Sequence, residues 1–265
     1  MKSLLTIAAM ALAATSATPA LAKSNDKPTI VLVHGAWETA GVWAEVESGL
    51  EKDGYKVKTV NLPGREGNPM PAGEVTLDAY QKAVAQVIAG ETKPVILVGH
   101  SFGGFVISAE GEAEPEKIKT LVYVAAYLPL DGQSLLGLAT TDAGSKAGEA
   151  LIIDKDKGIA GIKYEARAGL FANGAPAPVG DAVAKGIVDE PLPPLTMPVH
   201  LTADRFGKVD KVYIHTLRDQ VVSPPFQAQM VAATPVRSEL SIDTGHIPFI
   251  VNPPGLVKLI EDAAK

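Results

Sequence analysis

Apolar runs and segments of helical spacing alternate along the first half of this chain. Three of the runs are almost continuously apolar, which is typical of strands covered on both faces, whereas a fourth alternates between apolar and polar positions. The pattern predicts strands at 29–33, 55–60, 95–98 and 118–126, and helices at 42–50, 77–89 and 102–113. Gly54 suits the end of the first helix and Thr76 the N-cap of the second. This alternation predicts the α/β class, with a parallel sheet and helices on both faces.

The pattern is interrupted between residues 129 and 198, where no clear strand is apparent. Gly, Ala, Pro and Asp are frequent there, and a stretch of about 70 such residues is too long for an ordinary loop. We expect a mainly helical cap insertion over the carboxyl edge of the sheet, where ligands bind in α/β proteins. A disordered insert is the alternative, which the apolar segments 151–153 and 166–171 disfavour. The α/β pattern then resumes, with strands expected at 211–216 and 237–242 and helices at 226–232 and 255–264.

The N-terminal residues have the composition of a secretory signal peptide. Lys2 gives a positive start, residues 4–14 form an apolar run too short to span a bilayer, and Ala20 and Ala22 form a small-x-small cleavage signal. An uncleaved membrane anchor is the alternative. We expect a signal peptide at 1–22, a single domain at 23–265 although its length also permits two, and a periplasmic or secreted location.

Composition removes several classes of function. The formal net charge is −6 and no basic cluster is apparent, so nucleic-acid binding has no electrostatic support. The chain contains no cysteine, which excludes disulfides, thiol nucleophiles and cysteine metal sites. We expect a small-molecule partner, no membrane partner after signal cleavage, no cofactor and no metal. The pattern gives no indication of the oligomeric state.

The candidate nucleophile is Ser101, in the G-x-S-x-G segment Gly99–Gly103. The segment follows a predicted strand and precedes a predicted helix, which is the context of a nucleophile elbow. There the serine lies on a tight turn, small flanking residues relieve crowding, and the helix directs free N–H groups at what the serine binds. A chance match in a chain with 25 glycines is the alternative, and the strand–turn–helix context disfavours it.

A serine nucleophile needs a base, and histidine is the plausible base at neutral pH. His246 follows the last predicted strand, so it shares the carboxyl edge of the sheet with Ser101. A surface or capping role is the alternative for His246. The other four histidines fit less well: His100 should point away from the serine, and the remaining three are His34 beside the first strand, His200 in the tail of the insertion and His215 within a strand.

The third member should be an acid on another loop of the same edge. Asp219 follows the strand at 211–216 and would fix the imidazole tautomer and stabilise the imidazolium. Asp131 and Asp243 are the rivals, although Asp243 is only three residues from the base. The order Ser101, Asp219, His246 is that of the α/β-hydrolases.

Acyl transfer also requires donors for the oxyanion. The N–H of Phe102 should be one, and the loop after the first strand should supply the other, with Ala36 as the assignment and Trp37 as the fallback. Gly35 would let this backbone approach the substrate, and Trp37 and Tyr127 could contribute to an apolar pocket. Packing residues are the alternative interpretation of each.

Four segments together resemble the α/β-hydrolases of the plant methylesterase and hydroxynitrile lyase group, and bacterial esterases of that group more closely still. They are Val31–Trp37, Gly99–Gly104, Lys211–Gln227 with its Asp219, and Gly245-His246. Hydroxynitrile lyases of the group carry a threonine at the position of Gly35 and a lysine at that of Ile247, which would offer charge to cyanide. The resemblance therefore implies ester hydrolysis.

These arguments lead to one function and two alternatives. We expect a serine carboxylesterase that hydrolyses small to medium, largely uncharged esters through an acyl-enzyme, because no cationic clamp for a charged acid is apparent. A hydroxynitrile lyase-type C–C lyase and a non-catalytic small-molecule receptor on the same fold are the alternatives.

Overall fold

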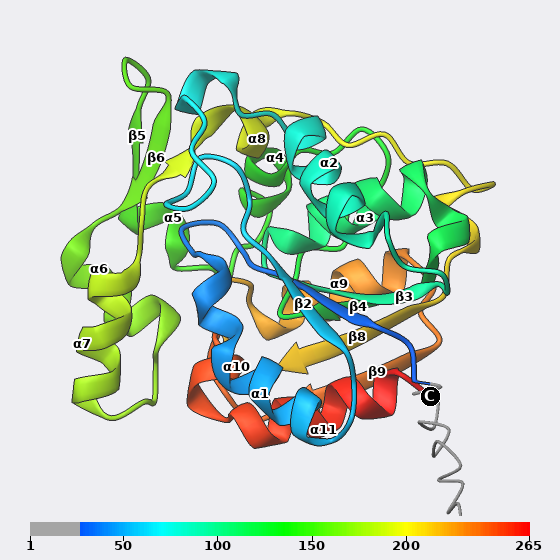
Figure 1. Cartoon of the computed structure of the whole chain (residues 1–265). Coiled ribbons are helices and arrows are strands. Elements are labelled where there is room, and N and C mark those ends of the chain that lie inside the picture. Colours follow the sequence, from blue (N-terminus) through cyan, green and yellow to red (C-terminus); the bar gives the residue numbers. More distant parts are fainter. Residues whose placement is uncertain (1–26) are drawn as a thin grey trace, which may run out of the picture.

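The protein is built on a six-stranded parallel sheet, as the alternating pattern predicted (Figure 1). The computed structural model describes residues 27–265, and the predicted signal peptide lies outside them. The strand order is β2-β1-β3-β4-β8-β9. In chain order the strands are β1 (Ile30–Val33), β2 (Val57–Val60), β3 (Val95–His100), β4 (Ile118–Val124), β8 (Lys211–Thr216) and β9 (Ser238–Ile242).

Helices cover both faces of this sheet. One face carries α1 (Ala44–Lys52) and α11 (Pro253–Ala263), which pack against each other, and the other carries α2 (Leu77–Ile88), α3 (Gly103–Ala113) and α9 (Pro224–Ala233) (Figure 1). Thr76 caps α2 as predicted, because its hydroxyl accepts a hydrogen bond from the Ala79 N–H at 3.0 Å. Gly54 follows α1 with φ 86, a conformation that glycine adopts without strain.

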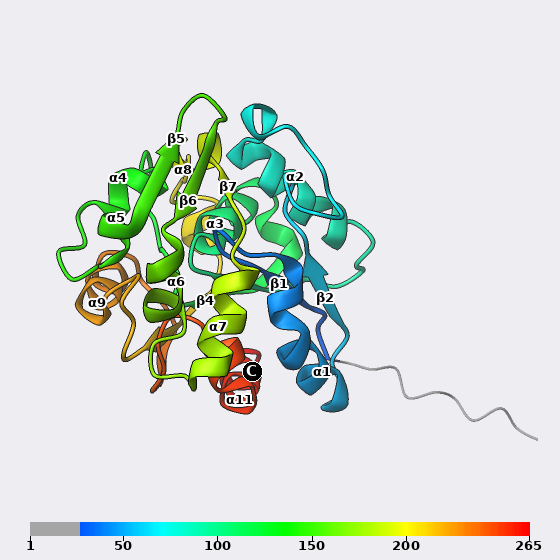
Figure 2. The same ribbon diagram turned by 90° about the vertical axis from the view of Figure 1, so that its left-hand side faces the viewer.

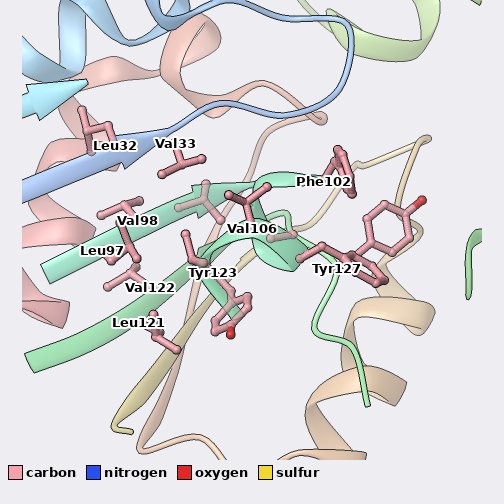
Figure 3. Packing of buried hydrophobic residues seen from close by; sticks show 14 of the residues in the cluster. Leu32, Val33, Leu97, Val98, Phe102, Val106, Leu121, Val122, Tyr123 and Tyr127 are labelled. Atoms are coloured by element: carbon pink, nitrogen blue, oxygen red, sulfur yellow. The ribbon is translucent and has the colours of Figure 1, made fainter. Parts of the chain in front are cut away.

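The main core lies between the central strands and their helices. Every residue of β1 and β3 is buried, which explains why their sequences are apolar without alternation. Leu32, Val98 and Val122 occupy matching positions on three adjacent strands and form one apolar layer, and Val106 of α3 belongs to the same buried cluster (Figure 3). Full burial of such a side chain contributes about 1.5–3 kcal/mol, so this layer holds the ends of the strands firmly in place.

Residues 129–198 form a cap beyond the carboxyl ends of the strands (Figure 2). Its helices are α4 (Leu135–Ala139), α5 (Ala147–Ala150), α6 (Tyr164–Phe171), α7 (Ala177–Gly186) and α8 (Leu192–Thr196). The cap is mainly helical, but the expectation that it contains no clear strand was wrong. An antiparallel sheet joins β5 (Leu151–Asp154), β6 (Ile159–Ile162) and β7 (Glu190–Pro191).

The cap strands have a local physical cause. Leu151, Ile152 and Ile153 favour a strand, and the turn that follows ends at Gly158, whose φ of 66 suits glycine. Within residues 27–265, no helix is both long and apolar enough to cross a bilayer.

Candidate active site

Ser101 occupies a strained turn between β3 and α3. Its φ is 51, in the left-handed region that side-chain-bearing residues seldom adopt. The flanking glycines permit this turn: a Cβ on Gly99 would lie 2.7 Å from the Gly103 carbonyl oxygen, and a Cβ on Gly103 would lie 2.9 Å from the carbonyl oxygen of His34. The elbow therefore requires glycine at both positions, which is the physical basis of the G-x-S-x-G pattern.

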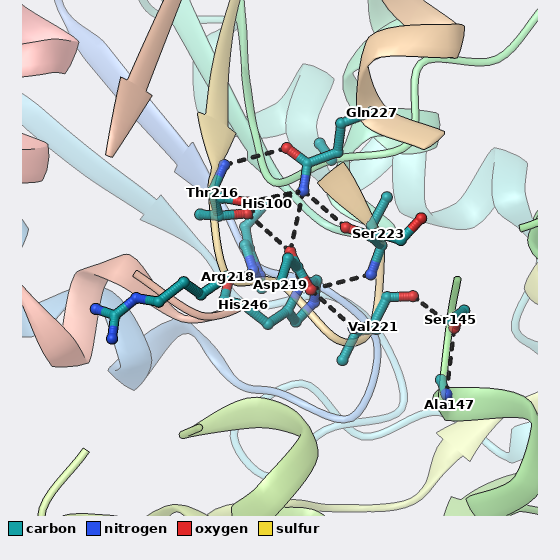
Figure 4. Close-up of polar contacts among 12 residues, drawn as sticks. His100, Ser145, Ala147, Thr216, Arg218, Asp219, Val221, Ser223, Gln227 and His246 are labelled. Carbon is teal, nitrogen blue, oxygen red and sulfur yellow. Dashed lines mark hydrogen bonds and ion pairs between the residues drawn. The ribbon is translucent and has the colours of Figure 1, made fainter. Parts of the chain in front are cut away.

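His246 and Asp219 meet at the carboxyl edge of the sheet. His246 Nδ1 lies 2.8 Å from Asp219 Oδ2, and both side chains are fully buried (Figure 4). The loop after β8 supplies the aspartate and the loop after β9 supplies the histidine. Because a carboxylate only accepts, Nδ1 carries the proton and Nε2 is left as the basic nitrogen.

Hydrogen bonds on both oxygens fix the Asp219 carboxylate. Oδ1 accepts from the backbone N–H groups of Val221 at 2.8 Å and Val222 at 3.0 Å. Oδ2 accepts from the Thr216 hydroxyl at 2.8 Å as well as from the imidazole. Gln227 Nε2 approaches Oδ2 at 3.3 Å and donates to the Val222 carbonyl at 2.7 Å (Figure 4). These donors hold the carboxylate in one orientation.

The second ring nitrogen of His246 makes no bond to the rest of the described chain. Nε2 is buried, and no hydrogen bond joins it to Ser101 or to another residue within 27–265. The ring packs against His100 at a centroid distance of 4.6 Å and against Phe171 at 5.7 Å. A catalytic serine–histidine bond is often long or unformed before substrate binds, so the lack of a partner leaves this nitrogen free to act as a base.

His100 points away from the cavity that Ser101 lines and links two parts of the site. Nε2 donates to the His246 carbonyl at 2.9 Å, and Nδ1 lies 3.0 Å from Glu38 Oε2. Burial would lower the pKa of His100, but the Glu38 carboxylate raises it above its ordinary value. Conversely, burial would raise the pKa of Glu38, and His100 lowers it. A buried ion pair therefore lies beside the nucleophile and fixes the backbone that carries the base.

The rival residues have other partners. Asp131 contacts His200 at 3.0 Å on an exposed surface, and the exposed carboxylate of Asp243 pairs with Arg218 at 2.9 Å. His215 contacts Glu239 at 3.0 Å. His34 is buried, donates from Nδ1 to the Gly35 carbonyl and accepts at Nε2 from the Leu62 N–H. Of the three candidate acids, Asp219 is the one that touches His246.

Two backbone donors flank Ser101. Within residues 27–265, neither the Ala36 N–H nor the Phe102 N–H donates a hydrogen bond. The Trp37 N–H, the fallback donor, instead donates to Glu190 Oε2 at 3.0 Å. That fallback was therefore wrong, because a carboxylate of the cap occupies this donor.

A cavity of about 310 Å³ opens over the elbow and is mostly apolar. The predicted site residues that line it are Ser101, Phe102, Ala36, Trp37 and Tyr127. Its remaining lining residues are Val221 and residues of the cap. Among the described residues that line the cavity, Asp142 is the one with a charged side chain. Gly35 lies behind Ser101: a Cβ there would lie 2.9 Å from Ser101 Cβ and 3.0 Å from His100 Nδ1, so glycine permits close packing, and its role toward substrate stays a prediction.

A model of the alpha/beta hydrolase family matches residues 30–259. The chain belongs to this family. The match covers the parallel sheet, the elbow, the cap and the two loops that carry Asp219 and His246, so the resemblance noted in the sequence is confirmed at the level of the family.

Curated relatives of this α/β-hydrolase come from plants and bacteria. It is 33% identical over 251 residues to putative methylesterase 14, chloroplastic, of Arabidopsis thaliana, covering 89% of this chain and 71% of that protein. It is 40% identical over 110 residues to the carbendazim hydrolyzing esterase of Nocardioides sp., covering 41% of this chain and 46% of that protein. A shorter match, 39% over 106 residues, covers 39% of this chain and 41% of the alpha-hydroxynitrile lyase of Arabidopsis thaliana.

Solved structures agree with the fold of this α/β-hydrolase. An extracellular alpha/beta-hydrolase from a Paenibacillus species, described as sharing structural and functional homology with tobacco salicylic acid binding protein 2, is 27% identical with a TM-score of 0.76. The alignment covers 89% of this chain and 98% of that one. A pyrethroid hydrolase from Sphingobium faniae JZ-2 is 24% identical with a TM-score of 0.77, over 89% and 97% of the two chains.

A second apolar cavity of about 490 Å³ lies between α7, the loop after β1 and α10 (Pro248–Val251) of this α/β-hydrolase. Trp37 lines both cavities, and its ring meets Phe171 edge-on at a centroid distance of 6.2 Å.

No cluster of metal-ligating side chains occurs in the part of the chain that the structure describes.

Glu38 and Glu190 were missed in the sequence. Glu38 lies in the loop after β1, where a single acidic residue has no distinguishing pattern. Glu190 lies 153 residues from Trp37 along the chain, in an insertion whose path over the site the sequence does not specify. The roles of Glu38 and Glu190 depend on contacts that form only when the chain is folded.

Proposed function

We propose that the protein is a serine carboxylesterase acting through an acyl-enzyme. Ser101 is the nucleophile, His246 the general base and acid, and Asp219 the residue that orients His246. The N–H groups of Ala36 and Phe102 bind the oxyanion. The observation that carries the proposal is the buried Asp219–His246 pair beside a strained serine that lines a cavity with two backbone donors that no residue of 27–265 engages.

The chemistry follows from these positions. His246 Nε2 takes the proton of Ser101 Oγ as the oxygen attacks the ester carbonyl, and the carbonyl electron pair moves onto the oxyanion. The tetrahedral intermediate collapses when the alkoxide leaves with the proton from His246. Water, deprotonated by the same nitrogen, then attacks the acyl-enzyme and releases the acid. Two preorganised donors stabilise the oxyanion in both steps, each by about 2.7–4 kcal/mol.

Small to medium uncharged esters are the substrate class. Among residues 27–265, no Lys, Arg or His lines the first cavity, and most of its lining is apolar. An anionic acyl group would lose hydration there without gaining a cationic partner, next to the Asp142 carboxylate. The names of the methylesterase and carbendazim esterase relatives support ester hydrolysis.

A short series of assays tests the proposal. The wild-type protein should hydrolyse short p-nitrophenyl esters, and a fluorophosphonate should label it at Ser101. Ser101→Ala should lose labelling and turnover, whereas Ser108→Ala, a serine hydrogen-bonded to Gly104 and Tyr123 within the core, should keep Ser101 labelling. A wild-type rate no higher than that of Ser101→Ala would refute the proposal, and cyanide release from mandelonitrile without ester turnover would favour the lyase alternative.

Export belongs to the same proposal. The apolar N-terminal run and the small residues before Lys23 support cleavage after Ala22 and action in the periplasm or the medium. N-terminal sequencing of the protein recovered from each fraction tests this.

A further inference from the structure

Trp37 has an unusual backbone for a bulky residue. Its φ is 63, in the left-handed region where large side chains are outliers. Trp37 directly follows Ala36, whose N–H is the proposed second donor to the oxyanion. A backbone of this kind persists only where its surroundings hold it, so the contacts of Trp37 determine how the loop presents Ala36.

All three polar groups of Trp37 pair with the cap. The backbone N–H donates to Glu190 Oε2 at 3.0 Å, the backbone carbonyl accepts from the Val188 N–H at 3.0 Å, and the indole N–H donates to the Ala160 carbonyl at 3.0 Å. The indole also meets Phe171 of α6 edge-on. The conformation of this core loop is therefore imposed by residues of the insertion.

The Glu190 carboxylate is itself held from the core side. The Tyr80 hydroxyl of α2 donates to Oε1 at 2.7 Å, and the Arg65 guanidinium pairs with Oε2. Arg65 also donates from Nε to the Glu38 carbonyl at 2.9 Å, one residue beyond Trp37. Arg65 and Glu190 are both buried, so this network has little freedom to rearrange.

The arrangement has a consequence for the donor set. Trp37 and Ala36 are neighbours, and only Ala36 keeps an N–H without a partner in the described chain. If the Trp37 N–H lost its acceptor, the strained peptide could relax and carry the Ala36 N–H away from the bound carbonyl. Donor placement matters because an oxyanion hole works only when its donors are already oriented.

We propose that Glu190 of the cap is a positioning residue for the oxyanion hole, because its carboxylate engages the Trp37 N–H and thereby fixes the Ala36 N–H beside Ser101. The inference rests on the proposed esterase function. It differs from a purely structural clamp, which would stabilise the fold without changing turnover.

Two double variants isolate the acceptor. Arg65→Met/Glu190→Gln and Arg65→Met/Glu190→Met both remove the buried ion pair and leave no unpaired charge, which is the tolerated way to replace such a pair. Gln and Met have similar shapes, but only Gln keeps an oxygen for the Trp37 N–H. Tyr80→Phe is the control, because it removes the hydrogen bonds that Tyr80 makes with Glu190 Oε1 and Arg65 but leaves Oε2 in place to accept from the Trp37 N–H.

The readouts are kcat and KM for a short p-nitrophenyl ester, the affinity of a trifluoromethyl ketone whose serine adduct carries an oxyanion, and the melting temperature. The Met double variant should have a kcat about 10- to 100-fold below the Gln double variant, with KM within about threefold. Its affinity for the ketone should fall by a similar factor. Tyr80→Phe should lower the melting temperature and leave kcat within about twofold of wild type.

Equal kcat and equal ketone affinity in the two folded double variants would overturn the inference. If either double variant fails to fold, Glu190→Asp is tested against wild type instead. This substitution keeps the charge opposite Arg65 but shortens the side chain by one methylene, which withdraws the carboxylate from the Trp37 N–H. It should lower kcat in the same way and leave KM nearly unchanged. Wild-type turnover that depends on Ser101, combined with unaffected Glu190 variants, removes this inference alone. Absence of turnover dependent on Ser101 removes the proposed function itself.

Discussion

The imidazole of His246 lies 2.8 Å from the carboxylate of Asp219, although 27 residues separate them in the sequence. Asp243, only three residues before His246, has its carboxylate on an exposed pair with Arg218 instead. The geometry of the parallel sheet brings Asp219 and His246 together, because the loops after β8 and β9 emerge at the same edge.

Asp219→Asn should lower kcat by roughly 10⁴-fold while the fold is retained, because an amide at this position favours the wrong imidazole tautomer. The measurement is steady-state hydrolysis of a p-nitrophenyl ester. Asp243→Asn is the matched control and should stay within about twofold of wild type, since it changes an exposed ion pair. Equal losses in the two variants would contradict the assignment of Asp219.

Gly104→Ala should destabilise the protein by about 3 kcal/mol or more, as overpacking against a rigid group does. A Cβ at Gly104 would lie 2.0 Å from the Tyr127 carbonyl oxygen, which is backbone and cannot yield easily. Gly169→Ala in α6 is the control: outside its own helical turn, no atom of residues 27–265 would lie within 4 Å of the added Cβ, so it should stabilise by about 0.5–1 kcal/mol through helix propensity. Urea unfolding measures both changes, and similar effects in the two variants would contradict this packing.

Stability should fall between pH 6.5 and 4 in a way that depends on His34. Burial lowers the pKa of His34 from 6.5 to about 4, so the unfolded chain binds a proton in this range before the folded chain does. The free energy of unfolding then decreases as the pH falls, by up to about 3 kcal/mol. His100 contributes in a different pH range. Because its pKa is raised in the folded protein, its contribution to the free energy of unfolding is complete below pH 6.5 and is lost as the pH rises through the folded-state pKa.

His34→Gln isolates this contribution. The variant should show a shallower fall in the free energy of unfolding than wild type between pH 6.5 and 4, measured by urea unfolding. Carboxylates titrate in both proteins, so the difference between the two slopes reports on His34. Identical slopes would mean that His34 is protonated as readily in the folded protein as in the unfolded chain.

Anionic esters should be poor substrates. We expect kcat/KM for a p-nitrophenyl hemisuccinate to lie at least about tenfold below that for the neutral butyrate, because the carboxylate is desolvated near Asp142. Thr140→Arg places a cation at the exposed rim of the same cavity and should narrow this ratio severalfold. A wild-type enzyme that treats the two esters alike would exclude the proposed preference.

The sheet could be predicted because its signals are local. Residues 30–33 and 95–98 are apolar at every position, and this pattern arises when both faces of a strand are covered. The elbow could be predicted for a similar reason, since its G-x-S-x-G pattern is confined to five residues and Gly99 avoids a clash with the carbonyl of Gly103 in the same turn. In the cap, the apolar residues 151–153 and the later Gly158 are compatible with a hairpin. The frequent Gly, Ala, Pro and Asp of the insertion made this hairpin hard to recognise from the sequence.

The residues that hold the site together were not predictable in this way. Glu38 acts through His100, 62 residues away, and Glu190 acts through Trp37, 153 residues away. A single buried acidic residue has no recognisable pattern in the sequence. Its role depends on which hydrogen-bond donors the folded chain places around its carboxylate.

The dependence of Trp37 on the cap bears on protein engineering. Insertions such as residues 129–198 are attractive units to exchange between relatives when a new substrate range is wanted. A graft that omits counterparts of Ala160, Val188 and Glu190 would also remove the groups that shape the loop after β1. A chimera with low turnover could then be discarded as having the wrong substrate pocket, although the cause is a displaced loop after β1. Restoring those three contacts would be the first change to test.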